Sequence, residues 1–467
     1  MASAGEKIVK LQEVGDVATP GERFWYNTQQ MKWAIYNLLF AAVYPFLLPG
    51  FLARMLRRGG YAARMGDRFA LYPDDVRAAL RRPGKPFVWI HAVSVGEVQV
   101  AGQLMREWRA AEPDVRFCFS TTSSTGWKMA EREVGDEDVL IYNPLDFPNF
   151  VKSALKTICP RAVVLTESEI WPNFIRRAKR MGIPLFLVNA RVSDRSAPRY
   201  RMGRVFFADV FSSFTRIFAQ SDLDKSRLVA AGAPDGIVDV TGSFKFDVAR
   251  RNEAKERELE KWIFGGAGRG GAAPCKILLG GSTWPGEDEV MLSVYRRLLG
   301  SKPGFSSVLV IAPRHFEKAD AVEANIAAAG FSCIRRSRPS DQAIRQSSGQ
   351  AVYLADTTGE LMGLYGIADA VFVGKSLCAH GSQNMIEPCL CGKPTFVGPY
   401  TENFRPVMSD LLASDAIVQV ADAAELEAKM CASLSDDGGL GARAKAAVEA
   451  RRGVVARCVA AIRGALA

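Results

Sequence analysis

The stretch Val88–Gln99, VWIHAVSVGEVQ, decides the fold of this chain. An apolar run, Phe87–Ile90, predicts a buried strand, and small residues such as Gly96 follow it. Helical periodicity starts at Val98, so we expect Glu97 where the strand passes into the helix. The helix N-terminus favours a carboxylate at that place, which leaves two interpretations open: a first-turn capping acid or a functional group.

Composition narrows the class of protein. The chain has 467 residues, of which 48% are hydrophobic and 24% charged, and this is enough for two ordinary domains with cores. Its nine cysteines are scattered without a Cys-x-x-Cys pair, which argues against a disulfide framework or a zinc module and favours a reducing compartment. Its three histidines lack metal-ligand spacing, so we expect no metal and no cofactor. The net charge of +10 suits an anionic partner: nucleic acid, a phosphorylated substrate or a membrane.

The N-terminal region predicts a membrane anchor. After a polar segment, 1–33, no charged residue occurs in Ala34–Ala53, and about twenty apolar positions suffice to cross a bilayer as a helix. Prolines in the run leave a span and a half-buried segment in one leaflet both open, beside a buried core helix. Basic residues follow the run: Arg54, Arg57, Arg58, Arg64 and Arg68. The positive-inside rule then places the large C-terminal portion in the cytoplasm, with the anchor and its basic exit at 34–58.

From Phe87 onward, strands alternate with helices, which predicts α/β domains with doubly wound parallel sheets. The expected strands of a first domain, 59–247, are Phe87–Ile90, Val115–Ser120, Val139–Tyr142, Ala162–Leu165, Pro184–Asn189, Arg216–Gln220 and Val238–Thr241. A charged helix, Glu253–Phe264, and a small-residue stretch, Gly265–Pro274, then predict a linker over 248–275. The expected strands of a second domain, 276–467, are Lys276–Gly280, Ser307–Ala312, Val352–Leu354, Ala370–Val373 and Pro394–Val397.

Three motifs imitate cofactor sites. Gly266, Gly268 and Gly271 match G-x-G-x-x-G, but a helix precedes them and a strand follows, the reverse of a dinucleotide-binding turn. The stretch Gly374–Ser376 resembles the end of a P-loop, yet Asp369 stands where the opening glycine belongs. The acids of Asp222–Asp224 begin a helix after a strand, where capping is the ordinary role.

Charged residues at expected strand ends indicate a ligand site, because open α/β sheets bind ligands at the carboxyl ends of their strands. Glu167 and Glu169 follow the strand Ala162–Leu165, and one of them has the alternative role of a helix cap. Lys245 follows the last strand of the first domain and is available to a negative charge.

The second domain carries a set of turns suited to a nucleotide phosphate. Gly280–Thr283 and Ala312–His315 leave strands, the second with Arg314 for a bidentate contact. Asp356–Leu361 and His380–Pro388 open helices, whose N-termini bind anions, and Glu387 suits ribose hydroxyls. Each turn alone is equally compatible with capping; four in one domain favour a binding site.

Taken in order, the motifs HAVSVGE, TESEIWPN, FAQSDLD, GSFKFD, GSTWPGE, APRHFE, DTTGELMGLYG and QNMIEPCLCGKPTFVGPYTENF closely resemble those of the 3-deoxy-D-manno-octulosonic acid (Kdo) transferases over nearly all of Tyr61–Pro406. The resemblance implies a GT-B fold of two Rossmann-like domains facing a cleft and preceded by a membrane-anchor helix. It implies an inverting, metal-independent glycosyltransferase of lipopolysaccharide biosynthesis, with CMP-Kdo as donor, the phosphorylated lipid A precursor as acceptor and no nucleic-acid partner.

The resemblance also implies roles for residues. Glu97 matches the catalytic base, and Glu167 and Lys245 match positions that stabilise the transition state. The CMP-contacting segments correspond to Pro313, Arg314, Gly359, Glu360, Leu361, Asn384, Met385, Ile386 and Glu387. The sequence departs from the family where a Gly-Gly-His-Asn-Pro-Leu-Glu pattern is common, because Gln383 and Met385 replace its histidine and proline.

Two other readings stay open at this point. Another GT-B enzyme, such as a nucleotide-sugar epimerase or a different sugar transferase, would share the phosphate cradle without a lipid anchor. A membrane-attached binding protein would keep the fold without chemistry, although it would have little use for this combination of acids and cations.

Overall fold

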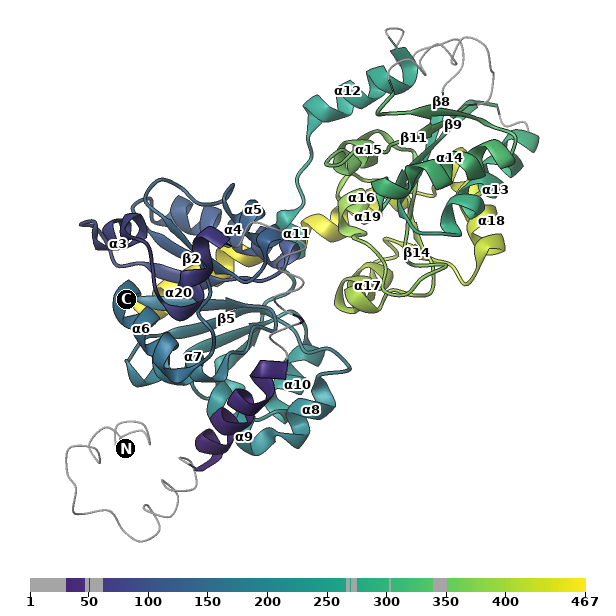
Figure 1. Cartoon of the computed structure of the whole chain (residues 1–467). Coiled ribbons are helices and arrows are strands. Elements are labelled where there is room, and N and C mark those ends of the chain that lie inside the picture. The colour runs from purple at the N-terminus through teal and green to yellow at the C-terminus, as the bar shows by residue number, and fades with distance from the viewer. Residues whose placement is uncertain are drawn as a thin grey trace, which may run out of the picture. The chain divides into compact units, whose positions relative to one another are not determined.

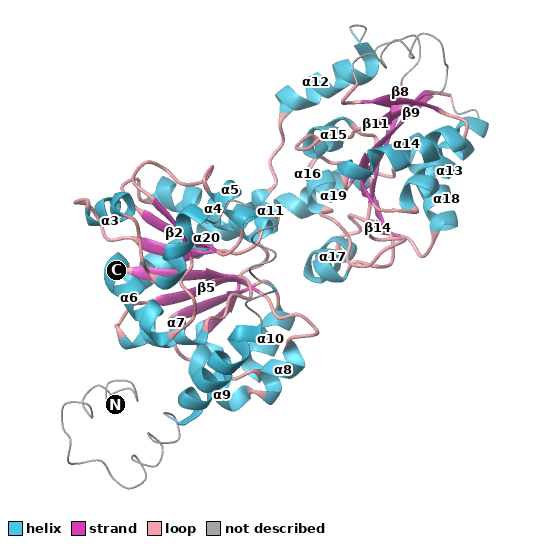
Figure 2. Ribbon diagram, viewed as in Figure 1, coloured by secondary structure: helices cyan, strands magenta, loops and turns pink. Residues whose placement is uncertain are grey.

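The computed structural model describes residues 31–46, 50, 62–265, 269, 275–301, 304–338 and 351–467. The chain divides into two compact units: the first runs to Asp239 and includes Ala461–Ala467, and the second is Val240–Ala460. Each unit contains one seven-stranded sheet, drawn in magenta in Figure 2 between cyan helices. The division falls after Asp239, so the stretch Gly242–Asp247, assigned above to the first domain, lies in the second unit.

The first unit is a doubly wound sheet, as the strand rhythm predicts. Its elements, coloured purple to teal in Figure 1, are η1 (Ala62–Phe69), α3 (Asp74–Arg81), β1 (Val88–His91), α4 (Val95–Ala111), β2 (Phe117–Thr121), α5 (Ser124–Ala130), β3 (Val139–Tyr142), α6 (Pro148–Ile158), β4 (Ala162–Thr166), α7 (Pro172–Arg180), β5 (Leu185–Ala190), α8 (Ala197–Met202), α9 (Arg204–Phe211), β6 (Arg216–Ala219), α10 (Asp222–Ala230), η2 (Asp235–Ile237) and β7 (Val238–Val240). The strand order is β3-β2-β1-β4-β5-β6-β7. The central strands are buried throughout, which is why their sequences are continuously apolar.

The second unit repeats this plan. Its elements are α11 (Lys245–Val248), α12 (Glu253–Phe264), β8 (Cys275–Thr283), α13 (Glu287–Gly300), β9 (Ser306–Pro313), η4 (Phe316–Lys318), α14 (Ala319–Ala328), β10 (Ser332–Arg335), β11 (Ala351–Leu354), α15 (Leu361–Ile367), β12 (Ala370–Val373), α16 (Ile386–Leu390), β13 (Thr395–Val397), η6 (Glu402–Phe404), α17 (Arg405–Ala413), β14 (Val418–Gln419), α18 (Ala423–Ser435), α19 (Leu440–Glu449) and α20 (Val454–Leu466). The strand order is β10-β11-β9-β8-β12-β13-β14. Helix α12, which falls within the predicted linker, packs Leu259, Trp262 and Ile263 into the core of this unit.

The order of the strands fixes where ligands bind. In the first sheet the order reverses between β1 and β4, which pair in parallel with His91 opposite Leu165. In the second sheet it reverses between β8 and β12. The crevice beyond the carboxyl ends of two such strands is the usual ligand site of open α/β sheets. Glu97 and Glu167 follow β1 and β4, so they lie at the reversal point of the first sheet.

Residues 31–46 form a helix that packs on the first unit. Trp33 is buried, and its ring lies 5.0 Å from that of Phe206 in α9. Among the residues that the structure describes, no helix is long and apolar enough to cross a bilayer. The rest of the predicted anchor, 47–49 and 51–53, lies outside the described residues, as do Arg54, Arg57 and Arg58.

Two arginines of the predicted basic exit have internal roles instead. Arg64 pairs with the buried Asp67 at 3.0 Å. Arg68 is buried and donates to the carbonyl of Thr122 at 2.5 Å. Arg64 and Arg68 therefore hold the segment around η1 in place, and sequence position alone does not distinguish a surface cation from one that holds a loop.

Candidate active site

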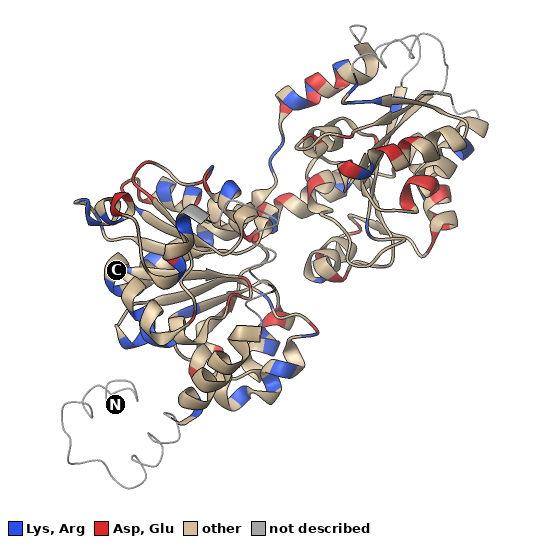
Figure 3. Cartoon of the chain, in the orientation of Figure 1, with Lys and Arg blue, Asp and Glu red and all other residues tan. Residues whose placement is uncertain are grey.

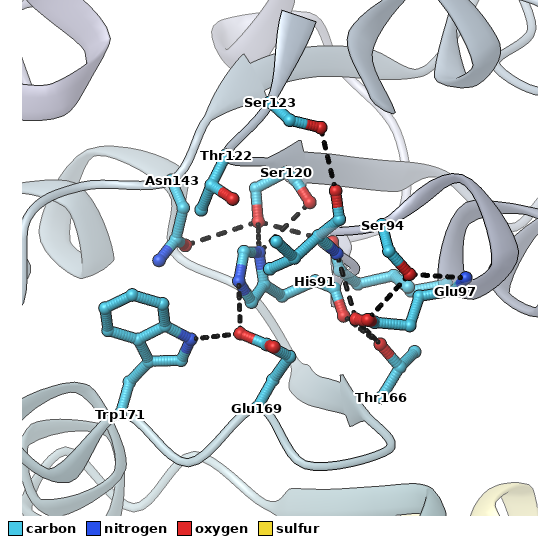
Figure 4. Close-up of polar contacts among 12 residues, drawn as sticks. His91, Ser94, Glu97, Ser120, Thr122, Ser123, Asn143, Thr166, Glu169 and Trp171 are labelled. Atoms are coloured by element: carbon cyan, nitrogen blue, oxygen red, sulfur yellow. Dashed lines mark hydrogen bonds and ion pairs between the residues drawn. The ribbon is translucent and has the colours of Figure 1, made fainter. Parts of the chain in front are cut away.

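Glu97 is the third residue of helix α4 and completes its N-terminal cap. The Ser94 hydroxyl accepts a hydrogen bond from the Glu97 N–H at 3.2 Å. In return, the Glu97 carboxylate accepts from the Ser94 hydroxyl at 2.8 Å and from the Val93 N–H at 3.0 Å. This is a variant of the capping box, drawn in Figure 4. The capping interpretation is thus confirmed, and the functional one has to rest on what else surrounds the carboxylate.

The surroundings of Glu97 make it a better proton acceptor than an ordinary glutamate. Burial raises the pKa of this carboxyl, and the negative charges of Glu169 and then Glu167 raise it further, against the lowering effect of the Val93 N–H and the Ser94 hydroxyl. A carboxylate that is both half-buried and close to other acids is a candidate general base.

Glu167 lies directly after β4 in a backbone conformation that is rare for its residue type. Its φ is +50°, and that of Asn189 at the end of β5 is +52°. The two side chains meet, because Asn189 donates to Glu167 at 3.2 Å, and Arg191 lies 4.0 Å from the same carboxylate. Left-handed backbone at a non-glycine residue is concentrated at functional sites. The structure thus holds Glu167 toward the same sheet edge as Glu97.

A histidine and a second acid complete this edge. His91 ends β1 and is fully buried, and its Nε2 lies 3.6 Å from Glu169 Oε2. The Trp171 indole donates to the same oxygen of Glu169 at 2.9 Å. Sequence reasoning did not single out His91 as a site residue. The signal that could have found it is a polar residue at the end of an otherwise apolar strand, a position where histidine needs a partner.

Lys245 begins α11 in the second unit. Its Nζ lies 4.3 Å from the ring of Phe404, a cation–π contact that links the GSFKFD and YTENF motifs. Two residues later the buried Asp247 accepts from the N–H groups of Gly453 and Val455 at 2.7 and 2.8 Å, and so caps α20. The local fold therefore fixes the backbone beside Lys245.

The predicted CMP-contacting residues fall into two groups. Pro313, Arg314, Gly359, Glu360 and Leu361 line a single cavity of about 130 Å³ beyond the ends of β8, β9 and β11. The backbone of Arg314 is held there, because its backbone N–H donates to the carbonyl of Thr283 at 3.0 Å. These residues come from two separate loops, one after β9 and one after β11, so the structure brings together what the sequence analysis grouped by motif.

Glu360 already has cationic partners at the edge of this cavity. Arg336 donates to it at 3.0 Å, Lys255 lies 3.5 Å away, and the Thr357 hydroxyl also donates to it. Burial alone would raise the pKa of Glu360, but the hydrogen bonds from Arg336 and Thr357 hold it below its usual range. Its side chain is therefore an anion fixed in place.

The second group, Asn384 to Glu387, is not among the residues that line this cavity. Met385 and Ile386 are fully buried in the core, so their side chains have a structural role. Asn384 donates to Glu387 at 2.9 Å and accepts from the Ile386 N–H at 3.1 Å. Burial raises the pKa of Glu387, and the bond from Asn384 opposes this.

The P-loop-like stretch binds an internal carboxylate. Glu287 is 0% exposed and accepts the N–H groups of Trp284, Lys375, Ser376, Leu377 and Cys378 at 2.8, 2.8, 3.1, 3.0 and 3.3 Å. Successive backbone N–H groups of this kind form an anion-binding nest. Because Glu287 fills the nest, these N–H groups are engaged within the protein, which agrees with the rejection of a P-loop. Glu287 was not predicted, since an acid in a first helical turn looks ordinary.

One acid of the D-x-D motif, Asp224, has a structural role. Asp224 accepts from the Ser221 hydroxyl at 2.6 Å and from the Val192 N–H at 2.8 Å. The N-cap of α10 is Ser221, whose hydroxyl accepts from the Asp224 N–H at 3.2 Å, so Asp224 supports the cap from the first turn and is not the capping residue itself. Within the described part of the chain, no three His, Cys, Asp or Glu side chains are grouped so that they could hold a metal ion.

Comparisons with known proteins agree with the motif order. The sequence model of the 3-deoxy-D-manno-octulosonic-acid transferases (kdotransferases) matches residues 63–248. A 3-deoxy-D-manno-octulosonic acid transferase of Bordetella pertussis is 32% identical over 400 residues, which cover 83% of this chain and 88% of the relative. This chain belongs to the Kdo transferase family. A transferase of the same name from Haemophilus influenzae is 30% identical over 78% of this chain and 82% of its own.

Solved structures place the Kdo transferase chain among GT-B-like folds. The UDP-GlcNAc 2-epimerase of Neisseria meningitidis, solved with UDP-GlcNAc bound, matches with a TM-score of 0.53 at 14% identity, over 82% of this chain and 99% of the epimerase. At this identity the likeness concerns the fold alone. The expected architecture of two parallel α/β sheets is thereby confirmed, and the choice between transferase and epimerase rests on the family.

Proposed function

We propose that this Kdo transferase moves Kdo from CMP-Kdo to the phosphorylated lipid A precursor, with inversion at the sugar carbon. The observation that carries the proposal is the position of Glu97, a carboxylate held in the first turn of α4 at the reversal point of the first sheet and within 3.3 Å of the Thr166 hydroxyl at the end of β4. An inverting transfer needs a base for the acceptor hydroxyl proton at the moment when the sugar–phosphate bond breaks. Membership of the family supplies the donor and the reaction class.

Each charge that develops in the transfer has a candidate partner. Glu97 accepts the proton of the acceptor hydroxyl as that oxygen bonds to the sugar. Glu167, fixed by Asn189 and Arg191, is an anion suited to the positive charge that grows on the sugar. Lys245 and Arg314 are cations suited to the phosphate of the departing CMP. In this proposal the two cations supply the charge neutralisation that a divalent ion supplies in other transferases.

Metal independence is therefore part of the proposal. Activity is expected to survive excess EDTA, measured as CMP release with both substrates present. Loss of activity in EDTA that magnesium restores would contradict it and would return Asp222 and Asp224 to consideration as ligands.

The exposed face of the helix 31–46 supports attachment to the cytoplasmic face of the inner membrane. One face packs on the first unit through Trp33 and Tyr36. The solvent-facing side chains recur with helical spacing and are all apolar: Met31, Ile35, Leu38, Leu39, Val43 and Phe46, the last 85% exposed. A soluble helix places polar residues there, whereas an interfacial helix has this composition.

The neighbouring turn between α8 and α9 extends the surface. Lys32 Nζ lies 3.5 Å from the carbonyl of Val205, and Val205 and Met202 are 69% and 83% exposed. The last turn of α8 carries Arg199 and Arg201, and the basic residues of this helix appear blue in Figure 3. Apolar side chains beside arginines suit the interface of an anionic membrane, including lipids with phosphate groups. Of the two topologies that the sequence left open, we therefore propose the one that lies in a single leaflet.

Vesicle sedimentation tests this surface. Replacement of Leu38, Leu39 and Phe46 by serine removes apolar side chains that are mostly exposed and is expected to release the full-length protein from anionic vesicles at high salt. The matched control replaces Leu412, which is also exposed but lies on α17 of the second unit. Vesicle binding of the triple variant equal to that of the native protein would contradict the proposal.

Donor turnover in the presence and absence of acceptor tests the main proposal. The transferase is expected to release CMP only when the lipid acceptor is present, and mass spectrometry of the lipid should show an added Kdo. Conversion of a nucleotide sugar without lipid would favour an epimerase instead, and donor binding without turnover would favour a binding protein.

A further inference from the structure

His91 is a buried histidine whose Nε2 faces a charged side chain, that of Glu169. Its Nδ1 lies 3.0 Å from the carbonyl and 2.9 Å from the hydroxyl of Ser120. Its Nε2 is buried, makes no hydrogen bond and lies 3.6 Å from Glu169 Oε2. Figure 4 shows the ring between Ser120 and Glu169. A buried nitrogen without a hydrogen-bond partner lowers the stability of the fold, so the position of Nε2 opposite the Glu169 carboxylate needs an explanation.

The orientation of the His91 ring is set from the β2 side. Trp89 donates its indole N–H to the Ser120 hydroxyl at 2.8 Å, and Asn143 Oδ1 lies 3.3 Å from the same oxygen. The Ser120 carbonyl only accepts, whereas the Ser120 hydroxyl can donate to Nδ1 or accept from it, so Ser120 holds the ring in either tautomer. In this orientation Nε2 faces Glu169 Oε2 at 3.6 Å.

Glu169 is held from the opposite side as well. The Trp171 indole N–H donates to its Oε2, the same oxygen that faces His91. Backbone turns tie the segment to β4, since the Glu169 N–H donates to the Thr166 carbonyl at 3.0 Å. The Thr166 hydroxyl in turn lies 3.0 Å from the His91 carbonyl and 3.3 Å from Glu97 Oε2. The end of β4 thus connects Glu169, His91 and Glu97 through short contacts.

The charges around the two acids come from several elements. Glu97 on α4 faces Glu169 and Glu167, together with the uncharged Ser94 and Thr166. Glu167 faces Arg191, which follows β5. Glu169 faces His91 and acts on Tyr200 of α8, whose pKa is raised by burial and then by that carboxylate. Of the two neighbouring acids, Glu169 raises the pKa of Glu97 more than Glu167 does.

We propose that His91 and Glu169 are a positioning pair, in which His91 holds the second carboxylate beside Glu97 and so keeps Glu97 the stronger proton acceptor of the site. The pair does not touch the reacting atoms; it acts through Glu97. The inference rests on the proposed function, in which Glu97 takes the acceptor proton. It explains why a strand that is otherwise apolar ends in a buried imidazole.

The pH dependence of kcat in the full-length enzyme tests the pair. Glu169→Gln removes the charge but keeps an acceptor for Trp171, so the acidic limb of the profile is expected to move to lower pH by roughly 0.5 to 1 unit. With His91→Gln as background, the shift caused by Glu169→Gln is expected to be less than half as large, because Glu169 is no longer held. Glu131→Gln is the matched control: Glu131 also accepts an indole N–H, from Trp127 at 2.7 Å, but it is exposed, and no shift is expected.

The proposal is overturned if the acidic limb of the pH profile stays in place in Glu169→Gln. It is also overturned if the shifts of the two single variants add in the double variant. A second readout is independent of turnover. With only three histidines in the chain, selectively labelled ring carbons give an assignable NMR spectrum. The His91 signal is expected to move in Glu169→Gln and to stay in Glu131→Gln; an unmoved signal refutes the pairing even if no Kdo-lipid forms. Absence of product from the native enzyme would instead refute the proposed function.

Discussion

Glu97→Gln separates the two roles that the structure gives this residue. The amide keeps the size of the side chain and, with its oxygen toward the Val93 N–H, one of the cap bonds of α4, so the loss of stability is about 1 kcal/mol or less. For a unit of this size that corresponds to a fall in Tm of about 2–4 °C at most. The amide is not basic, so removal of a general base is expected to lower kcat by roughly 10²–10⁴-fold, or about 2.7–5.4 kcal/mol in the barrier.

The assay is CMP release under saturating donor and lipid, combined with calorimetric titration of the donor. Donor affinity is expected to stay within about twofold, because the predicted nucleotide cavity lies in the second unit. Glu425→Gln is the control, since Glu425 caps α18 in the same way, with its carboxylate accepting from the Ala421 N–H at 2.7 Å. Near-normal kcat in Glu97→Gln would refute the assignment of the base. A loss of Tm well beyond that of Glu425→Gln, with a parallel loss of activity, would reduce Glu97 to a cap.

Three further outcomes are expected. Glu287→Gln turns an amide toward backbone N–H groups and should lower the free energy of unfolding in urea by roughly 2–4 kcal/mol; unchanged stability would contradict the nest. Lys245→Met keeps an unbranched apolar side chain beside Phe404 but removes the charge, so kcat should fall roughly 10²-fold while Tm changes little; unchanged kcat would remove Lys245 from the site. Burial raises the pKa of Asp146 to about 7, so the native state holds a proton that the unfolded state releases near pH 4. Stability measured by urea unfolding should therefore fall as pH rises from about 4 to 7, and this slope should flatten in Asp146→Asn; equal slopes would contradict it.

The strands were predictable because buried parallel strands leave an unmistakable sequence pattern. Val139–Tyr142 and Ala370–Val373 have the predicted bounds, and the other predicted strands differ only at their ends. The strands that the analysis missed, β10 and β14, are an outermost and a two-residue strand of the second sheet. A strand at an edge is held by its backbone on one side and needs few apolar side chains, so its sequence carries little signal.

The site was predictable in part for a geometric reason. Carboxyl ends of neighbouring parallel strands share one edge of the sheet, so acids after β1 and β4 had to come close. What the sequence did not reveal are roles that arise from contacts between distant segments. His91 gains its role only when Glu169 comes within 3.6 Å, and Glu287 only when the loop after β12 folds around it. Neither contact leaves a local pattern.

The two interpretations of Glu97 that stood as alternatives are parts of one arrangement. The cap fixes the carboxylate at the start of a rigid helix, which is the precision that a proton acceptor needs. The same cap bonds stabilise the charged form and so weaken the base. A base in a capping position therefore needs an opposing influence, and burial with Glu169 and Glu167 supplies it. On this argument Glu167 and Glu169, the acids after β4, keep the pKa of Glu97 high, in addition to the role proposed for Glu167 at the sugar. Removal of either acid should make Glu97 a better cap and a poorer base.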